Sequence, residues 1–244
     1  MMIFLCFSSN DRYTIVESVL YHLKNYGLNT WYDYHRLILG DDKFRENLDN
    51  GVKKCKYAIW ILSRSFYTCE CGQMELKLIK QMYEHGQIHI FPILYNLKAS
   101  ELPCEYVWVR NLIYNELTDS SGSLPTCNQI VSKILKDEID NNSYIALSRS
   151  NGFDEYSNLL ISTYYDLDER NLNSKITTLY CLYKYMTINV EREENILTYS
   201  RIMDYLFKIT KLNLSISFKE LIIAEQVVTI MINSRGENIE YDNR

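Results

Sequence analysis

The nine residues IFLCFSSND at positions 3–11 decide the fold class of this chain. Residues 3–7 form a continuous apolar run, which is typical of a strand buried on both faces of a parallel sheet. Residues 8–11 then offer side-chain oxygens that can cap a helix, and apolar residues recur at helical spacing from Ile15 to Leu23. A buried strand followed at once by an amphipathic helix predicts a βα unit.

The same alternation of strand and helix patterns continues through the first 140 residues. Short connections between such elements favour βαβ units and a parallel sheet. We therefore expect an α/β fold with a flavodoxin-like, five-stranded parallel sheet in the order 2-1-3-4-5, whose ligands bind at the carboxyl ends of the strands. After the first strand, further strands are expected at 28–32, 57–62, 88–95 (with Pro92 in an awkward interior position) and within 107–114, and further helices at 44–55, 73–85 and 127–139.

The chain changes character near residue 143, after which only helical periodicity is visible. A capping box, Ser217-x-x-Glu220, precedes the last of these helices. The sequence thus predicts a domain over residues 1–142 and a small all-α bundle over residues 143–244 that serves packing or dimerisation. The expected helices span 153–165, 174–186, 198–212 and 218–233.

Composition narrows the function classes. Among 244 residues, 47% are hydrophobic, enough for a sizeable core, and the net charge of −5 argues against non-specific nucleic-acid binding. No apolar run approaches the length of a membrane span, and no signal peptide is visible, so we expect no membrane association and a cytoplasmic location. The seven cysteines lack zinc-site spacing, which favours free thiols and no bound metal.

Several familiar site motifs are absent from the sequence. It contains no GxGxxG after a strand, no GxxxxGK[ST] and no GxSxG, which excludes the usual dinucleotide, P-loop and nucleophile-elbow sites. A phosphoacceptor receiver domain shares the expected strand order but needs acidic residues where this chain has Ser8-Ser9 and Ser63-Arg64.

Glu75 is the one residue whose position invites a chemical interpretation. It shares a helix face with Ile79 and Met82, which have the spacing of core residues. A carboxylate near a helix start also favours the helix dipole without any function, and the residues alone favour that simpler interpretation. The alternative is a functional carboxylate, because the preceding loop leaves the third strand where ligands bind in such sheets.

Six segments occur in order over roughly residues 1–140, namely IFLCFSSNDR at 3–12, GLNTWYD at 27–33, LILGD at 37–41, AIWILS at 58–63 followed by Ser65-Phe66, CGQMEL at 71–76 and IFPI at 90–93. Taken in this order, they resemble the TIR family (Toll/interleukin-1 receptor-like domains). The resemblance implies cleavage of NAD+ at the nicotinamide–ribose bond, with Glu75 as the essential carboxylate. Nicotinamide leaves as a neutral molecule, and one fixed carboxylate can stabilise the ribosyl cation that remains. The resemblance therefore implies an enzyme that takes NAD+ as its substrate and needs no cofactor or metal.

The same resemblance implies a set of substrate-binding positions. Arg36 is expected either at the pyrophosphate or in solvent. Cys71 occupies the position where many enzymatic members carry Trp, so stacking on nicotinamide must come from another residue. The implied positions are Phe7, Ser8, Ser9, Arg12, Asp33, Arg36, Gly40, Asp41 and Cys71.

The resemblance also extends to possible partners. A TIR domain beside a small extra module resembles prokaryotic antiphage proteins, such as the TIR components of Thoeris systems, which make an ADP-ribose-derived signal nucleotide that activates a separate effector protein. This resemblance leaves a phage sensor as the alternative role of the helical bundle. The loop at residues 37–42 commonly completes a neighbour's pocket in the family, which implies self-association through the TIR domain. Two alternatives stay open: a non-enzymatic adaptor that binds partners through this loop, and a virulence protein that depletes host NAD+.

Overall fold

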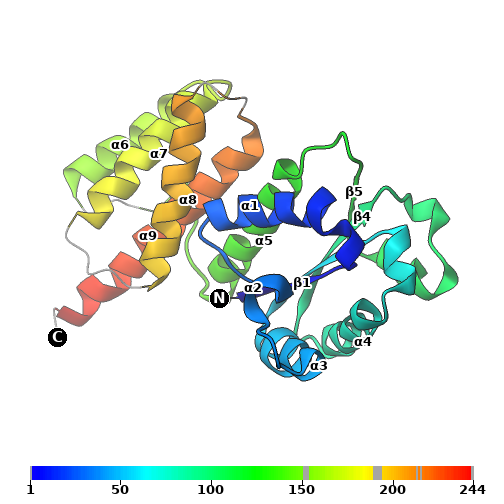
Figure 1. Ribbon diagram of the computed structural model, residues 1–244. Helices are drawn as coiled ribbons and strands as arrows, with labels where there is room; N and C mark the ends of the chain where they lie inside the picture. Colours follow the sequence, from blue (N-terminus) through cyan, green and yellow to red (C-terminus); the bar gives the residue numbers. More distant parts are fainter. Residues whose placement is uncertain (1, 151–153, 189–193, 213, 215, 243–244) are drawn as a thin grey trace. The chain divides into compact units, whose positions relative to one another are not determined.

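The computed structural model separates the chain into two compact units. One unit carries the β-sheet and the other is helical (Figure 1). The first unit comprises Met1–Lys24 and Leu28–Cys127, and the second comprises Asn25–Gly27 and Asn128–Arg244. The structure describes residues 2–150, 154–188, 194–212, 214 and 216–242.

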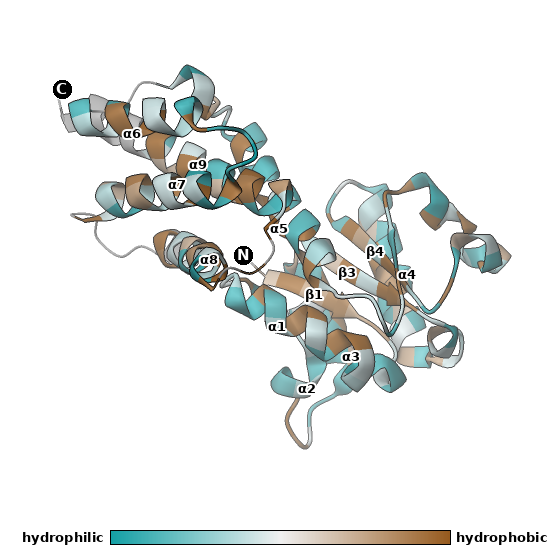
Figure 2. Ribbon diagram, turned by 90° about the horizontal axis from the view of Figure 1, so that it is seen from above, coloured by the Kyte–Doolittle hydropathy of each residue, from teal (hydrophilic) through white to brown (hydrophobic). Residues whose placement is uncertain are grey.

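The sheet of the first unit is parallel and has the order β2-β1-β3-β4-β5, which confirms the predicted fold class. The central strand, β3, is buried at all six residues, as its continuous apolar sequence predicts. Figure 2 shows the central strands in the colours of hydrophobic residues. The strands span Met2–Cys6 (β1), Asn29–Trp31 (β2), Tyr57–Leu62 (β3), His89–Tyr95 (β4) and Asn115–Leu117 (β5).

Helices lie on both sides of this sheet, with α3 and α4 on one side and α1 on the other (Figure 1). Phe4 and Cys6 alternate along β1 and belong to the same apolar core as Leu76 and Ile79 of α4. Alternation in a strand thereby puts Cys6 on the sheet face that α4 covers. The helices that begin in this unit are α1 (Glu17–Asn25), α2 (Asp33–Arg36), α3 (Lys43–Arg45), α4 (Glu70–Glu84) and α5 (Leu124–Asn141).

The helix expected at 44–55 is not a regular α-helix. After α3 it continues as a π-helical turn at Glu46–Gly51 and then as a 3₁₀ turn at Val52–Lys54. The extra residue of a π turn rotates the following side chains relative to an α-helix. Asn47, inside the π-helical turn, is buried, whereas Phe44, which regular helical spacing places in the core, lies before the turn in α3 and is exposed.

The fifth strand was expected within 107–114, and this prediction is wrong. Residues Cys104–Asn111 form a 3₁₀ helix that buries Tyr106 and Val109, and β5 follows it. Pro92 does lie inside β4, paired with Trp60 of β3. Pairing with β5 starts one residue later, at Ile93, so β4 is still an edge strand on that side and tolerates a proline.

The second unit contains the helices expected after residue 143. The last helix is longer than expected, and the first begins after the capping residue Asp154, whose carboxylate accepts from Ser157 N at 2.7 Å. Phe153, where that helix was expected to begin, lies outside the described residues. Within the described part of the chain, no helix is both long and apolar enough to cross a membrane. The four helices are α6 (Glu155–Asp166), α7 (Leu172–Thr187), α8 (Glu194–Lys211) and α9 (Phe218–Asp242).

The capping box expected before α9 forms in part. Ser217 N donates to Glu220 Oε2 at 2.9 Å, as the motif requires. The Ser217 hydroxyl accepts instead from Lys219 N, at 3.2 Å, one residue short of the usual partner. Glu220 is buried, and its second oxygen accepts from Asn128 Nδ2 of α5 at 2.7 Å.

Most of helix α5 belongs to the helical unit rather than to the sheet unit. Besides the bond between Asn128 and Glu220, Gln226 Nε2 donates to Ser132 O at 3.1 Å. The Tyr199 hydroxyl also donates to Glu138 near the end of α5. These polar contacts join α5 to α8 and α9. The domain boundary expected after residue 142 remains a prediction.

Candidate active site

Glu75 lies in the second turn of α4 and is 7% exposed. It shares the buried side of this helix with Leu76 and Ile79. The helical spacing noted in the sequence therefore places the carboxylate on the core side of the helix. A buried carboxylate needs hydrogen-bond partners, and these come from a different part of the chain.

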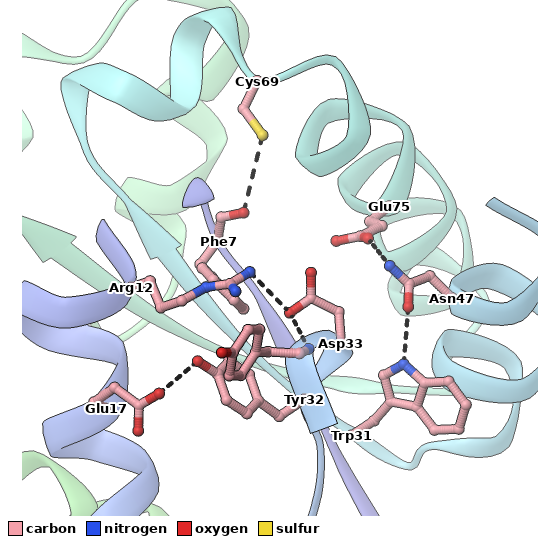
Figure 3. A network of polar contacts seen from close by, with 10 residues as sticks. Phe7, Arg12, Glu17, Trp31, Tyr32, Asp33, Asn47, Cys69 and Glu75 are labelled. Carbon is pink, nitrogen blue, oxygen red and sulfur yellow. Dashed lines mark hydrogen bonds and ion pairs between the residues drawn. The ribbon is translucent and has the colours of Figure 1, made fainter. Parts of the chain in front are cut away.

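Asn47 is the direct partner of Glu75. Its Nδ2 donates to Glu75 Oε1 at 2.8 Å, and its Oδ1 accepts from Trp31 Nε1 at 3.0 Å. Figure 3 shows the three side chains in a row, from β2 through the π-helical turn to α4. Asn47 is itself only 2% exposed, so both bonds are shielded from water.

Burial dominates the electrostatics of the Glu75 carboxyl group. Removal from water raises the pKa of Glu75 to about 8, and the negative charge of Asp33 acts in the same direction. The hydrogen bond from Asn47 has the largest opposing effect on this pKa, followed by the positive charge of Lys43. Cys6 lies beside the carboxyl, and burial together with Glu75 raises the pKa of its thiol well above the usual range.

A second group of side chains surrounds Arg12 near the carboxyl ends of β1 and β2. The Arg12 guanidinium lies 4.6 Å from the ring centroid of Tyr34, 5.8 Å from that of Tyr32 and 5.9 Å from that of Phe7. These distances are within the range of cation–π attraction. Arg12 Nη2 also contacts Asp33 Oδ1, at 3.5 Å (Figure 3). The contact is long for a charge-assisted hydrogen bond, so Arg12 is held mainly by aromatic rings.

The structure brings some of the implied site residues together and leaves others apart from them. Phe7, Arg12, Asp33 and Glu75 gather in the region that Figure 3 shows. The other implied residues lie outside this group. Ser8 is buried and Ser9 exposed, Cys71 is half-buried in the first turn of α4, and Arg36 is exposed, 5.8 Å from the Trp31 ring centroid.

The loop at residues 37–41 projects into solvent. Ile38 is 76% exposed and Leu39 is fully exposed. Asp41 Oδ2 accepts from Ile38 N at 2.7 Å and closes a turn, while Gly40 adopts a φ of 100°, which favours glycine. Two exposed aliphatic side chains at a loop tip are a feature that protein–protein contacts use.

Sequence reasoning missed Asn47 and Trp31 as part of this site. The apolar repeat at Phe44 and Leu48 suggested a regular helix, and the π-helical turn changes which side chains face inward. One signal was present: Asn47 lies four residues before Gly51, and a glycine inside a helix pattern indicates close packing.

A further polar cluster, which the sequence did not predict, joins the loop after β1 to the loop after β3. Ser63 Oγ donates to Asp11 Oδ2 at 2.6 Å, and Ser65 Oγ donates to Asp11 Oδ1 at 3.0 Å. Asp11 is buried, and both of its carboxylate oxygens are used in this way. The cluster fixes the position of the first loop, which carries Phe7 and Arg12.

All seven cysteines are free thiols. In the ranges that the structure describes, no group of three or more His, Cys, Asp or Glu side chains is placed to hold a metal ion.

Comparisons with known proteins agree with this architecture. A family model described as "TIR domain" matches residues 3–131 of the 244. "NAD(+) hydrolase TcpA" of Theionarchaea archaeon is 28% identical over 134 residues, which are 55% of this chain and 39% of that protein. "NAD(+) hydrolase TcpC" of Escherichia coli is 34% identical over 101 residues, 41% of this chain and 32% of that protein.

Two further matches have related descriptions. "2' cyclic ADP-D-ribose synthase BtTIR" of Bacteroides thetaiotaomicron is 30% identical over 99 residues, 41% of this chain and 34% of that protein. The solved TIR domain of the Toll-related receptor TRR-2 from Hydra magnipapillata is 17% identical with a TM-score of 0.39, over 57% of this chain and 95% of that one.

The matches to the three bacterial and archaeal proteins each span between about a third and two fifths of the relative's own length. The family model, by contrast, covers more than half of this chain and includes β1 to β5 with the loops that carry the site. The segment order found in the sequence and the strand order found in the structure agree with that match: the chain belongs to the TIR domain family.

Proposed function

We propose that this protein cleaves NAD+ at the nicotinamide–ribose bond, with Glu75 as the catalytic carboxylate. The observation that carries the proposal is a carboxylate that is buried and held by a buried amide at the carboxyl edge of a parallel sheet. The names of the relatives, NAD+ hydrolases and a cyclic ADP-ribose synthase, support the choice of substrate.

The chemistry asks little of the protein beyond a placed negative charge. When the bond between ribose C1′ and the pyridinium nitrogen breaks, the electron pair goes to that nitrogen and nicotinamide leaves neutral. The positive charge that develops on the ribose is stabilised by the Glu75 carboxylate. A charge interaction of this kind is stronger in a site that excludes water than in bulk solvent.

The ribosyl cation has two classes of acceptor. Attack by water gives ADP-ribose and releases one proton. Attack by a hydroxyl of the same molecule gives a cyclic ADP-ribose and also releases a proton. Both product classes occur among the names of the relatives, and the proposal covers both.

Arg12 is proposed to bind the pyrophosphate of NAD+. Its Nε is buried and has no hydrogen-bond partner within the described residues, and its contact with Asp33 is long. An anionic ligand would provide strong acceptors for these donors. Arg36, exposed above Trp31, is a second cation near the same edge.

Self-association through the TIR domain forms part of the proposal, because the exposed loop that carries Ile38 and Leu39 offers an apolar surface for a second copy. The same loop favours one other function, that of an adaptor that binds other proteins without turnover. As a finer proposal, the enzyme acts in antiphage defence, where a cyclic product or conjugate activates a separate effector protein. The alternative is that it is a virulence protein that depletes the NAD+ of a host.

The test uses the full chain, incubated with NAD+ and followed by mass spectrometry of the products. The wild-type protein should release nicotinamide together with ADP-ribose or a cyclic isomer, and Glu75→Gln should release neither. Glu70→Gln, on the exposed side of the same helix, is the matched control and should remain active. A folded Glu75→Gln variant with wild-type turnover would refute the assignment of Glu75. A wild-type protein without turnover would favour the adaptor.

A further inference from the structure

We infer that Asn47, itself oriented by Trp31, is a positioning residue that favours the charged form of the Glu75 carboxyl group and holds this group in one orientation for the reaction. The inference rests on the proposed function. It adds that the Asn47 side chain influences the orientation and the charge state of the catalytic carboxyl group. Three observations carry it: the direction of two hydrogen bonds, the close packing that places Asn47, and the set of charges that surround Glu75.

The two hydrogen bonds have a fixed direction. A carboxamide has a donor end and an acceptor end, and alone it could present either one to Glu75. The indole N–H of Trp31 can only donate, so Asn47 Oδ1 must face Trp31, at 3.0 Å. The NH₂ group of Asn47 is thereby directed at Glu75, at 2.8 Å. Trp31 thus determines that Glu75 receives a hydrogen-bond donor, which favours its anionic form.

Gly51 makes this arrangement possible through close packing. A Cβ atom at Gly51 would lie 2.7 Å from the Phe4 ring and 2.8 Å from Trp31 Nε1. Without that atom, the π-helical turn can approach the sheet closely enough for Asn47 to reach the indole. π-Helical turns occur frequently at functional sites, and this one carries the buried amide that binds the proposed catalytic residue.

The groups around Glu75 leave Asn47 with a distinct role. Asp33, after β2, disfavours the charged form of Glu75, and Lys43 of α3 favours it. The Cys6 thiol, from β1, is a weak hydrogen-bonding neighbour whose own pKa is raised. Burial has the largest effect and favours the protonated carboxyl. Among these groups, Asn47 has the largest effect in favour of the carboxylate, and a hydrogen bond to a charged group is the strong kind.

The first test replaces Asn47 with Leu, which keeps the branched shape of the side chain and removes the donor. The pH at which NAD+ turnover is half-maximal should rise by about one unit, and kcat at pH 7 should fall about tenfold, while KM changes little. Asn50→Leu is the matched control, because Asn50 lies in the same turn and bonds to Glu46 and Lys54 instead. Its pH profile should equal that of the wild type.

Trp31→Phe tests the orienting role separately. It retains an aromatic ring and removes the donor, so the Asn47 amide is free to turn its oxygen toward Glu75. The pH profile should shift in the same direction as in Asn47→Leu. The double variant should shift no further than Asn47→Leu alone, because both substitutions act through one hydrogen bond to Glu75. Independent, additive shifts would overturn the orienting role of Trp31.

A titration without substrate separates this inference from the proposed function. Carbon-13 labelling of glutamate, with Glu75→Gln for assignment, reports the Glu75 carboxyl by NMR in each variant. The Glu75 pKa should rise in Asn47→Leu and in Trp31→Phe and stay constant in Asn50→Leu. An unchanged Glu75 pKa in folded Asn47→Leu refutes the role of Asn47, and Trp31→Phe decides the matter if Asn47→Leu does not fold. Absent turnover in the wild type would refute the proposed function alone.

Discussion

Replacing Glu75 with Gln should stabilise the folded protein, and by a larger amount at pH 8 than at pH 5. The pKa of Glu75 is raised from 4.5 to about 8 by burial, so the folded state retains a proton that the unfolded state has already lost. Between these pH values the folded state binds more protons. The free energy of unfolding therefore falls as pH rises from about 4.5 to about 8 and changes little from this cause outside that window.

The size of the effect follows from the pKa difference. A shift of about 3.5 units, at 1.36 kcal/mol per unit, corresponds to at most about 5 kcal/mol above pH 8. According to the linkage relation, the raised pKa of Glu75 lowers the free energy of unfolding of the wild type by about 1 kcal/mol at pH 5, about 3 kcal/mol at pH 7 and about 4 kcal/mol at pH 8. Gln has the size of Glu, remains neutral throughout and can still accept from Asn47, so it avoids the cost.

The assay is urea unfolding of the wild type and Glu75→Gln at pH 5, 6, 7 and 8. The stability difference between the two proteins should grow in favour of Glu75→Gln by about 2–4 kcal/mol across this range. Glu70→Gln, exposed on the same helix, should differ from the wild type by a nearly constant amount. A difference for Glu75→Gln that stays constant with pH would refute the claim that burial holds a proton on this carboxyl.

Three further predictions concern other parts of the chain. Specific activity should rise with protein concentration, and Gly40→Pro should suppress that rise because proline cannot adopt the φ of 100°; activity that is constant with concentration in a monomeric protein would contradict this. Gly51→Ala should lower the free energy of unfolding by about 1–3 kcal/mol and reduce turnover, whereas Gly122→Ala, with open space around it, should change neither. Truncation after Asn142 should lower solubility or oligomeric order and the melting temperature, because α5 loses its contacts with α8 and α9. Calorimetry and sedimentation that match the full chain would count against this prediction.

The architecture of the sheet could be predicted from the sequence because its signals are local. Tyr57–Leu62 is a continuous apolar run, and in a parallel sheet covered on both faces such a run has one favoured place, the centre. β5, by contrast, is the short segment Asn115–Leu117 with two polar residues, and the apolar stretch before it forms a 3₁₀ helix. A strand of this length has no periodicity to detect, so its position depends on pairing with β4.

The position of Glu75 and its core-facing spacing were also determined by the sequence, since both follow from helical periodicity and the resemblance to a family. Its partners were decided by the tertiary structure. Asn47 and Trp31 are 28 and 44 residues away in the chain, and they meet Glu75 because Gly51 lets a π-helical turn approach the sheet. The raised pKa likewise has no local signal, because it arises from water excluded by side chains of several elements that come together only in the folded chain.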